Sequence, residues 1–199
     1  MSHFSHRKYF RRYKLNVEQY GEILVAQAFQ GKKMGDAQRG YDIGVSKKHF
    51  KEALQKAGAD VKQIRRFLPK PDEEIRIEVK SKLMPTSEAT VVHCGRTKFE
   101  GKRLKDGIKP GMTHLAIVIV LPGGCASGAN HSQEKDEEGL IDNAWLITRD
   151  RAHKLLRKHT KDKYIISPQE VKHAAGNRGI IDIKTLLRKA ARANCVKPT

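Results

Sequence analysis

The stretch that most constrains the fold is an apolar run at residues 114–121. It contains Leu115-Ala116-Ile117-Val118-Ile119-Val120, in which β-branched residues dominate and no charge interrupts. A run of this length and composition is typical of a central strand that is buried on both faces. We therefore expect a sheet whose central strand is covered on its two sides.

Helical and strand patterns alternate around this run and predict a mixed α/β domain. Helices are expected at residues 17–30, 47–58 and 61–68, after Thr148, and from Pro168 and Asp182; strands are expected at residues 41–45, 74–82, 89–93, 143–147 and 164–166. Residues 95–109 are predicted to form a basic connection, helical in part. No internal repeat or domain boundary is visible, so the 199 residues are expected to form one domain. Its appendages are a basic arm (1–14), a helical insert (47–68) and a flexible, acidic loop (122–141).

The formal net charge of +18 predicts a polyanionic partner. Nucleic acid is the first choice, and an anionic membrane surface is the weaker one. In the arm, cations alternate with aromatic rings, which suits phosphate contacts and base stacking. The segment from Arg149 to Thr199 carries 14 Lys and Arg against 4 Asp and Glu and is a candidate DNA-facing side.

Cysteine usage and hydropathy indicate the compartment. The three cysteines are scattered, with no disulfide framework and no paired zinc spacing. The chain shows no signal-peptide pattern and no stretch of ~18 consecutive apolar residues. We therefore expect a reducing, intracellular location and no membrane insertion.

Residues 75–82 alternate apolar and polar side chains with a period of two, which predicts a strand with one buried face. Ile75, Ile77 and Val79 point to one side, and Arg76, Glu78 and Lys80 point to the other. The polar side is either a solvated strand face or part of a reacting site. Glu78 and Lys80 would then lie roughly 6–7 Å apart along one face, a plausible spacing for a metal ligand and a cation on one phosphate.

Two further carboxylates favour the reacting site. Glu22 falls in the middle of a helix with little polar surface, and Asp42 starts a strand facing away from its apolar side. Asp42 and Glu78 on neighbouring strands, with the carbonyl of Val79, make a hard oxygen site suited to Mg²⁺ or Mn²⁺. Such a metal polarises a phosphodiester and lowers the pKa of a bound water. Lys80 would position that water or stabilise charge on phosphorus.

The pattern Gly21-Glu22 with Val25-Ala26, then Gly40-Tyr41-Asp42-Ile43, then Ile77-Glu78-Val79-Lys80 resembles the PD-(D/E)xK nuclease superfamily. That superfamily includes type II restriction endonucleases, archaeal-type Holliday junction resolvases and repair nucleases. The resemblance covers about the first 82 residues. It implies a restriction-endonuclease-like fold with a mixed central sheet flanked by helices. Pro71-Asp72 also spells the motif, so Asp72, and more distantly Asp36, are alternatives to Asp42.

The resemblance also implies the division of roles. Asp42 and Glu78 would bind the metal, Lys80 would be the catalytic lysine, and Glu22 would match the helix glutamate that some members add. The implied activity is a Mg²⁺-dependent endonuclease on double-stranded DNA, most simply a cytoplasmic, homodimeric restriction enzyme of a prokaryotic cell or phage. A junction-resolving or repair nuclease, and a basic nucleic-acid-binding protein without catalysis, are the alternatives. Expected DNA contacts are Arg96, Thr97, Lys98, Lys102, Arg103, Arg11 and Arg12.

Overall fold

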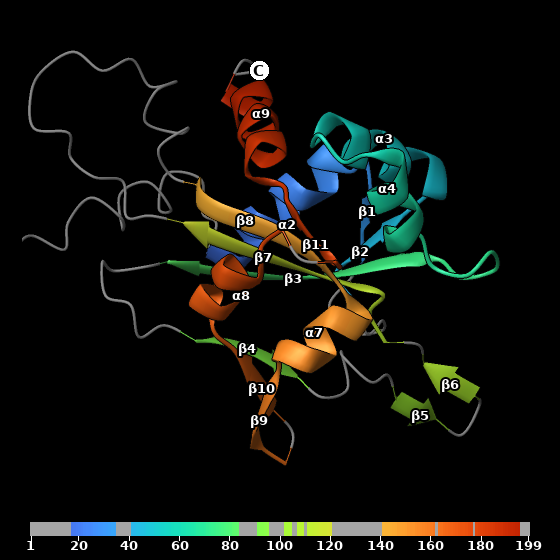
Figure 1. The fold of residues 1–199 in the computed structure, drawn as a ribbon, viewed down its shortest axis with the longest axis vertical. Helices are drawn as coiled ribbons and strands as arrows, with labels where there is room; N and C mark the ends of the chain where they lie inside the picture. The colour runs from blue at the N-terminus through green and yellow to red at the C-terminus, as the bar shows by residue number, and fades with distance from the viewer. Residues whose placement is uncertain are drawn as a thin grey trace, which may run out of the picture.

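The computed structural model describes residues 17–34, 41–83, 91–95, 102–104, 107–109, 111–120, 141–161, 163–176 and 178–195. Within them, a mixed sheet of six strands has the order β1-β2-β3-β7-β8-β11 (Figure 1). Only β3 and β7 in this sheet run parallel, and the other neighbours are antiparallel. The strands are β1 (Lys32–Lys33), β2 (Ile43–Val45), β3 (Ile75–Leu83), β7 (His114–Val120), β8 (Ile141–Thr148) and β11 (Ile180–Asp182).

Helices and two smaller sheets complete the described part of the chain. One small sheet has the order β4-β10-β9, and β5 pairs with β6 in a hairpin. Their bounds are β4 (Val92–Gly95), β5 (Lys102–Leu104), β6 (Gly107–Lys109), β9 (Arg157–Thr160) and β10 (Lys163–Ile166). The helices are α2 (Val17–Ala28), α3 (Lys47–Lys56), α4 (Val61–Phe67), α7 (Arg149–Leu155), α8 (Pro168–Ala174) and α9 (Lys184–Cys195). None of these helices is both long and apolar enough to cross a bilayer.

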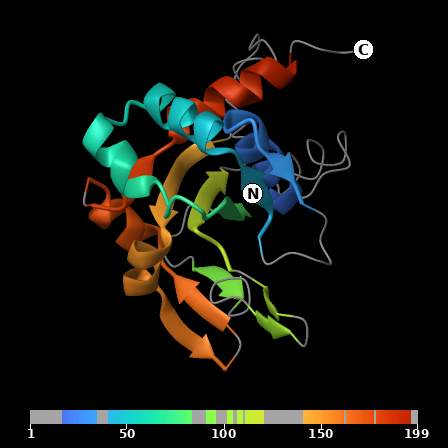
Figure 2. The ribbon, with the colours of Figure 1, turned by 90° about the vertical axis from the view of Figure 1, so that its right-hand side faces the viewer.

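Each face of the main sheet carries its own hydrophobic core. On one face, Ile77 and Val118 pack with residues of α2, α3, α4 and α9. On the other face, Leu115 and Ile117 pack with residues of α7, α8, β4 and β10. Figure 2 shows α9 and the N-terminal helices above the sheet and the β4-β10-β9 sheet below it. The prediction of a mixed α/β domain, with a mixed central sheet flanked by helices, is therefore confirmed.

The central strand confirms the expectation that was drawn from its composition. Every residue of β7 is buried, and the strand lies between β3 and β8. Alternate side chains contribute to the two cores, so each face of β7 is covered as predicted. The apolar face of β3 behaves as expected too, because Ile75, Ile77 and Val79 are all buried in the first core.

One local prediction was wrong, and another stays partly untested. In the basic connection, residues 102–104 and 107–109 form the β5–β6 hairpin, whereas residues 96–101 lie outside the described part, so a helical portion of this segment stays a prediction. The last helix begins at Lys184, not at Asp182, because residues 180–182 pair with β8 as β11. Asp182 instead accepts a hydrogen bond on Oδ1 from the Lys184 N–H at 2.7 Å. Of the acidic loop at 122–141, residues 122–140 lie outside the described part, and Ile141 already belongs to β8.

Close contact between α2 and β3 depends on Gly21. A Cβ at this position would lie 1.7 Å from Ser81 Oγ and 2.8 Å from Ser81 Cβ. No side chain larger than hydrogen fits there unless one of the elements moves. Gly21 therefore allows α2 to lie directly on the face of β3 that carries Val79 and Ser81.

Candidate active site

Asp42 and Glu78 come together where β2 meets β3. The register of this antiparallel pair places Ile43 opposite Ile77. Asp42 immediately precedes β2, and its N–H donates to the Ile77 carbonyl at 3.1 Å. Its carboxylate Oδ2 accepts the N–H of Val79 at 2.8 Å. Because these two hydrogen bonds join Asp42 to the residues before and after Glu78, the two carboxylate-bearing residues lie side by side, about one strand spacing of ~4.8 Å apart.

The backbone of Val79 adds an oxygen on the same side. In an antiparallel ladder, a strand residue directs its N–H and C=O toward the same neighbouring strand. The Val79 N–H points to Asp42, so the Val79 carbonyl also points toward the β2 side of β3. The three groups expected to bind a metal are therefore found in one small region.

Lys80 forms an ion pair with Glu78. Its Nζ lies 2.7 Å from Glu78 Oε1. The Glu78 side chain is fully buried, with 0% of its surface exposed, whereas that of Lys80 is 20% exposed. Glu78 lies next to Leu115 of β7, and Lys80 lies next to Ile117, on the face of the second core. A buried carboxylate at this position is costly, and the ammonium offsets part of that cost.

The alternative of a solvated strand face is therefore wrong for this side of β3. Glu78 is fully buried, and Arg76, two residues earlier on the same side, is 6% exposed. The Arg76 Nε donates to the Gly111 carbonyl at 2.7 Å, and its Nη2 contacts Glu73 Oε1 at 2.7 Å. Arg76 thus has a structural role at the start of the strand, while Lys80 and Glu78 occupy its middle.

Glu22 forms an ion pair of its own, with Lys33 and not with Lys80. Its Oε2 is 2.6 Å from Lys33 Nζ on β1, and its side chain is 14% exposed. The helix that bears it covers the face of β3 formed by Val79 and Ser81, opposite to that of Glu78. In the described part of the chain, no three His, Cys, Asp or Glu side chains are close enough together to hold a metal ion. The structure therefore joins Asp42, Glu78 and Lys80, and it pairs Glu22 with Lys33.

The remaining predicted residues fall into three groups. Asp72, the alternative acid, is exposed in a turn before β3. Asp36, Arg96, Thr97, Lys98, Arg11, Arg12 and the basic arm lie outside the described residues. For Lys102 and Arg103 only the backbone is described, in β5. Their contacts with DNA stay predictions.

A cation-rich strand, β9 of the β4-β10-β9 sheet, lies in the C-terminal segment that was expected to face DNA. All four residues of β9 are exposed, including Arg157, Lys158 and His159. The His159 ring contacts that of His93 with a centroid distance of 5.5 Å. The pKa of His93 is lowered from 6.5, first by partial burial and then by repulsion from His159, Lys82 and Lys163. β9 thus consists of exposed polar residues, and its contact with DNA stays a prediction.

Comparison of the sequence with protein-family models and with curated proteins gave no match.

Proposed function

We propose that this chain is a metal-dependent endonuclease that hydrolyses phosphodiester bonds of double-stranded DNA, with a restriction-endonuclease-like fold. The observation that carries the proposal is the adjacency of Asp42 and Glu78 on neighbouring strands, with Lys80 2.7 Å from Glu78. A buried carboxylate is costly to keep in a core unless it is paired or coordinates a metal, and Glu78 is fully buried beside Lys80. The net charge of +18 supports a nucleic-acid substrate.

The oxygen donors fit Mg²⁺ better than a metal that requires a complete protein cage. Mg²⁺ retains several waters and is commonly bound through one or two carboxylates together with substrate phosphates. Asp42, Glu78 and the Val79 carbonyl would hold it, and Mn²⁺ suits the same oxygens. When bound, the ion would polarise the phosphate and lower the pKa of a coordinated water. The lack of a third nearby acid among the described residues is compatible with such a site.

The residues of this chain supply the remaining parts of the proposed site. Asp42 is held in place by the Val79 N–H, so its orientation is set before substrate arrives. Lys80 forms an ion pair with Glu78 in the free protein, and in the proposed reaction its ammonium would stabilise negative charge on a phosphate bound beside Glu78. Glu22 pairs with Lys33, and its helix covers the opposite face of β3, so we propose that it does not bind the metal.

Cleavage of supercoiled plasmid tests this proposal. Wild-type protein with Mg²⁺ is expected to nick or linearise the plasmid, and EDTA is expected to stop the reaction. Asp42→Asn and Glu78→Gln should each reduce the rate by about 100-fold or more, because each removes a charge from the proposed site. Asp72→Asn is the matched control, since it makes the same change at an exposed acid. Equal rates for Asp42→Asn and wild type would refute the assignment.

The DNA substrate class needs a second comparison. Discrete fragments from linear DNA would support a restriction enzyme, and selective cleavage of four-way junctions would support a resolvase. A gel shift with no cleavage by any form would favour a basic binding protein without catalysis. Cleavage of both strands at one position is expected to involve a homodimer with one site per subunit. Light scattering of the DNA complex measures that stoichiometry.

A further inference from the structure

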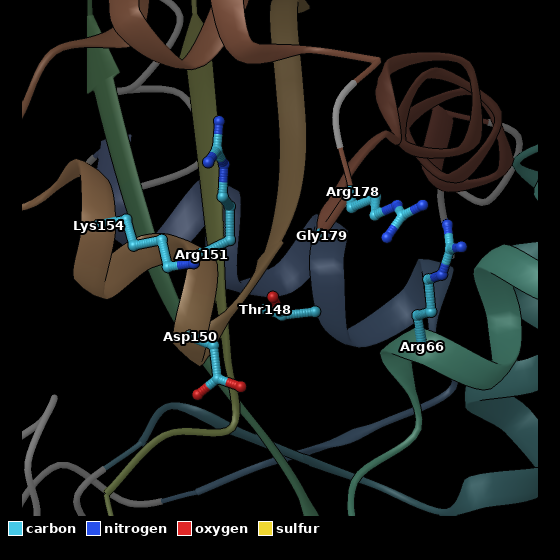
Figure 3. A pocket seen from close by; sticks show the side chains of 7 residues that line it. All are labelled: Arg66, Thr148, Asp150, Arg151, Lys154, Arg178 and Gly179. Atoms are coloured by element: carbon cyan, nitrogen blue, oxygen red, sulfur yellow. The ribbon is translucent and has the colours of Figure 1, made fainter.

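A hollow with a strongly cationic lining lies at one end of the main sheet (Figure 3). Its volume is about 590 Å³. Four cations from three segments line it: Arg66 of α4, Arg151 and Lys154 of α7, and Arg178 just before β11. In Figure 3, Arg66 and Arg178 approach from one side, and Arg151 and Lys154 extend from α7 on the other. Residues distant in sequence are thus gathered around one space.

The charge of this hollow is not balanced by the residues that line it. Among the described residues that line it, Asp150 is the single acid, and Figure 3 shows its carboxylate directed away from the three arginines. Within the described residues, none of the four cations forms an ion pair. The Nε of Arg151 is buried and has no hydrogen-bond partner there. An unsatisfied buried donor is costly, so an anion in this space would be stabilised by groups that lack other partners.

The floor of the hollow is tightly built around Gly179. This residue has a φ of +93°, and a Cβ would lie 2.8 Å from Thr148 Oγ1 and 2.9 Å from Arg151 Cβ. The Thr148 N–H donates to the Gly179 carbonyl at 3.0 Å. Gly179 thus brings the stem of Arg151 and the hydroxyl of Thr148 together. The position of the arginine is therefore set by close backbone packing.

The guanidinium groups of Arg66, Arg151 and Arg178 and the hydroxyl of Thr148 make a set of donors suited to phosphate oxygens. Guanidinium groups match phosphate through paired hydrogen bonds, and hydroxyls commonly add one more. We propose that this hollow binds a backbone phosphate of DNA, at a place separate from the Asp42–Glu78 site. The identification of DNA as the source rests on the proposed function, whereas the preference for phosphate rests on the lining residues alone.

The position of the hollow suits a nucleic acid that also reaches the candidate active site. Thr148 pairs with His114, and His114 pairs with Ile77, the residue before Glu78. Two strand spacings, roughly 10 Å, therefore separate Thr148 from Ile77. The hollow opens at the end of the sheet, between α4 on one face and α7 on the other. With a rise of about 3.4 Å per nucleotide, this separation corresponds to about three base pairs.

DNA binding without metal tests the inference independently of cleavage. Fluorescence anisotropy of a labelled duplex in EDTA, at several salt concentrations, is measured for wild type and Arg151→Gln/Arg178→Gln. The control is Lys51→Gln/Lys189→Gln, which removes two exposed cations on α3 and α9. For Arg151→Gln/Arg178→Gln, called the pocket variant below, the magnitude of the slope of log K against log salt should fall by about two, and the affinity should fall at least about tenfold. An equal slope and affinity for the pocket and control variants would overturn the DNA assignment.

Phosphorus NMR with inorganic phosphate distinguishes the source of the ligand. Broadening of the phosphate resonance by wild-type protein, and its loss with the pocket variant, would support a phosphate site. If that loss occurs while duplex binding stays equal to the control, the hollow takes free phosphate or a nucleotide and the DNA assignment fails. If neither measurement changes, the whole inference fails. Circular dichroism verifies folding, and Arg66→Gln/Lys154→Gln, which alters two exposed side chains, serves if the first pair misfolds. Normal duplex binding without plasmid cleavage would count against the proposed function only.

Discussion

Acidification should destabilise the protein through His114, a buried residue of β7. Its Nε2 lies 2.8 Å from the Phe67 carbonyl, so this nitrogen carries the proton and donates. Its Nδ1 lies 2.9 Å from Thr113 Oγ1. Burial lowers the pKa of His114 from 6.5 to about 4, the bond to Phe67 opposes this effect, and Arg76 adds to it. The imidazole is therefore neutral in the folded protein at pH 7.

The sign and size of the effect follow from proton linkage. The pKa of His114 is lower in the folded state, so between pH 6.5 and 4 the unfolded chain binds more protons. The free energy of unfolding therefore falls as the pH drops through this window. At about 1.4 kcal/mol per pKa unit, the full loss is about 3 kcal/mol. About 2 kcal/mol of this should already be lost between pH 7.5 and pH 5.

Urea unfolding of wild type and His114→Gln across this pH range isolates the effect. Glutamine retains an N–H donor for the Phe67 carbonyl but does not titrate. Other groups contribute equally to both proteins, so the stability difference between them should shrink by about 2 kcal/mol from pH 7.5 to pH 5. A difference that is constant within about 0.5 kcal/mol would refute the reasoning. NMR titration of His114 in the wild type provides a direct check of its pKa.

Three further substitutions test separate parts of the structure. Gly21→Ala should destabilise by about 1–3 kcal/mol in thermal unfolding, because the new Cβ overlaps Ser81, and Ser81→Gly in the same chain should restore most of the loss. Asp60→Ala should cost about 1 kcal/mol in urea unfolding, since Asp60 Oδ1 accepts the Gln63 N–H at 2.6 Å in the capping box of α4, whereas Asp60→Asn should stay near wild type. Lys33→Met should change the free energy of unfolding by less than about 1 kcal/mol, because the Lys33 side chain that contacts Glu22 is 41% exposed. A larger loss would mean that this ion pair holds β1 in place.

The elements that sequence patterns predicted correctly are those with strong local signals. The uninterrupted apolar run of β7 and the alternation in β3 determine how each strand is buried, because burial follows directly from side-chain polarity. By contrast, β9 contains Arg157 and Lys158 and no apolar residue, and it is a strand because it pairs with β10. β11 was missed because its residues depend on pairing with β8, a contact distant in sequence.

In the candidate site too, some features follow from local sequence patterns and others depend on packing. The order of Asp42, Glu78 and Lys80 along two strands indicated that the three would meet, and they do. The complete burial of Glu78 and the ion pair between Glu22 and Lys33 depend on how layers pack, which no local pattern contains. The cationic hollow was also invisible in sequence, because Arg66 and Arg178 meet only through the fold.

The measurement that tests the central claim most directly is Mn²⁺ titration of isotope-labelled protein, followed by NMR. If Asp42 and Glu78 form the metal site, low Mn²⁺ should broaden the backbone signals of Asp42, Glu78 and Val79 first, and Mg²⁺ in excess should reverse the broadening. Asp42→Asn should abolish this local effect, while Asp72→Asn should leave it unchanged. Broadening centred elsewhere, or unchanged broadening in Asp42→Asn, would contradict the account.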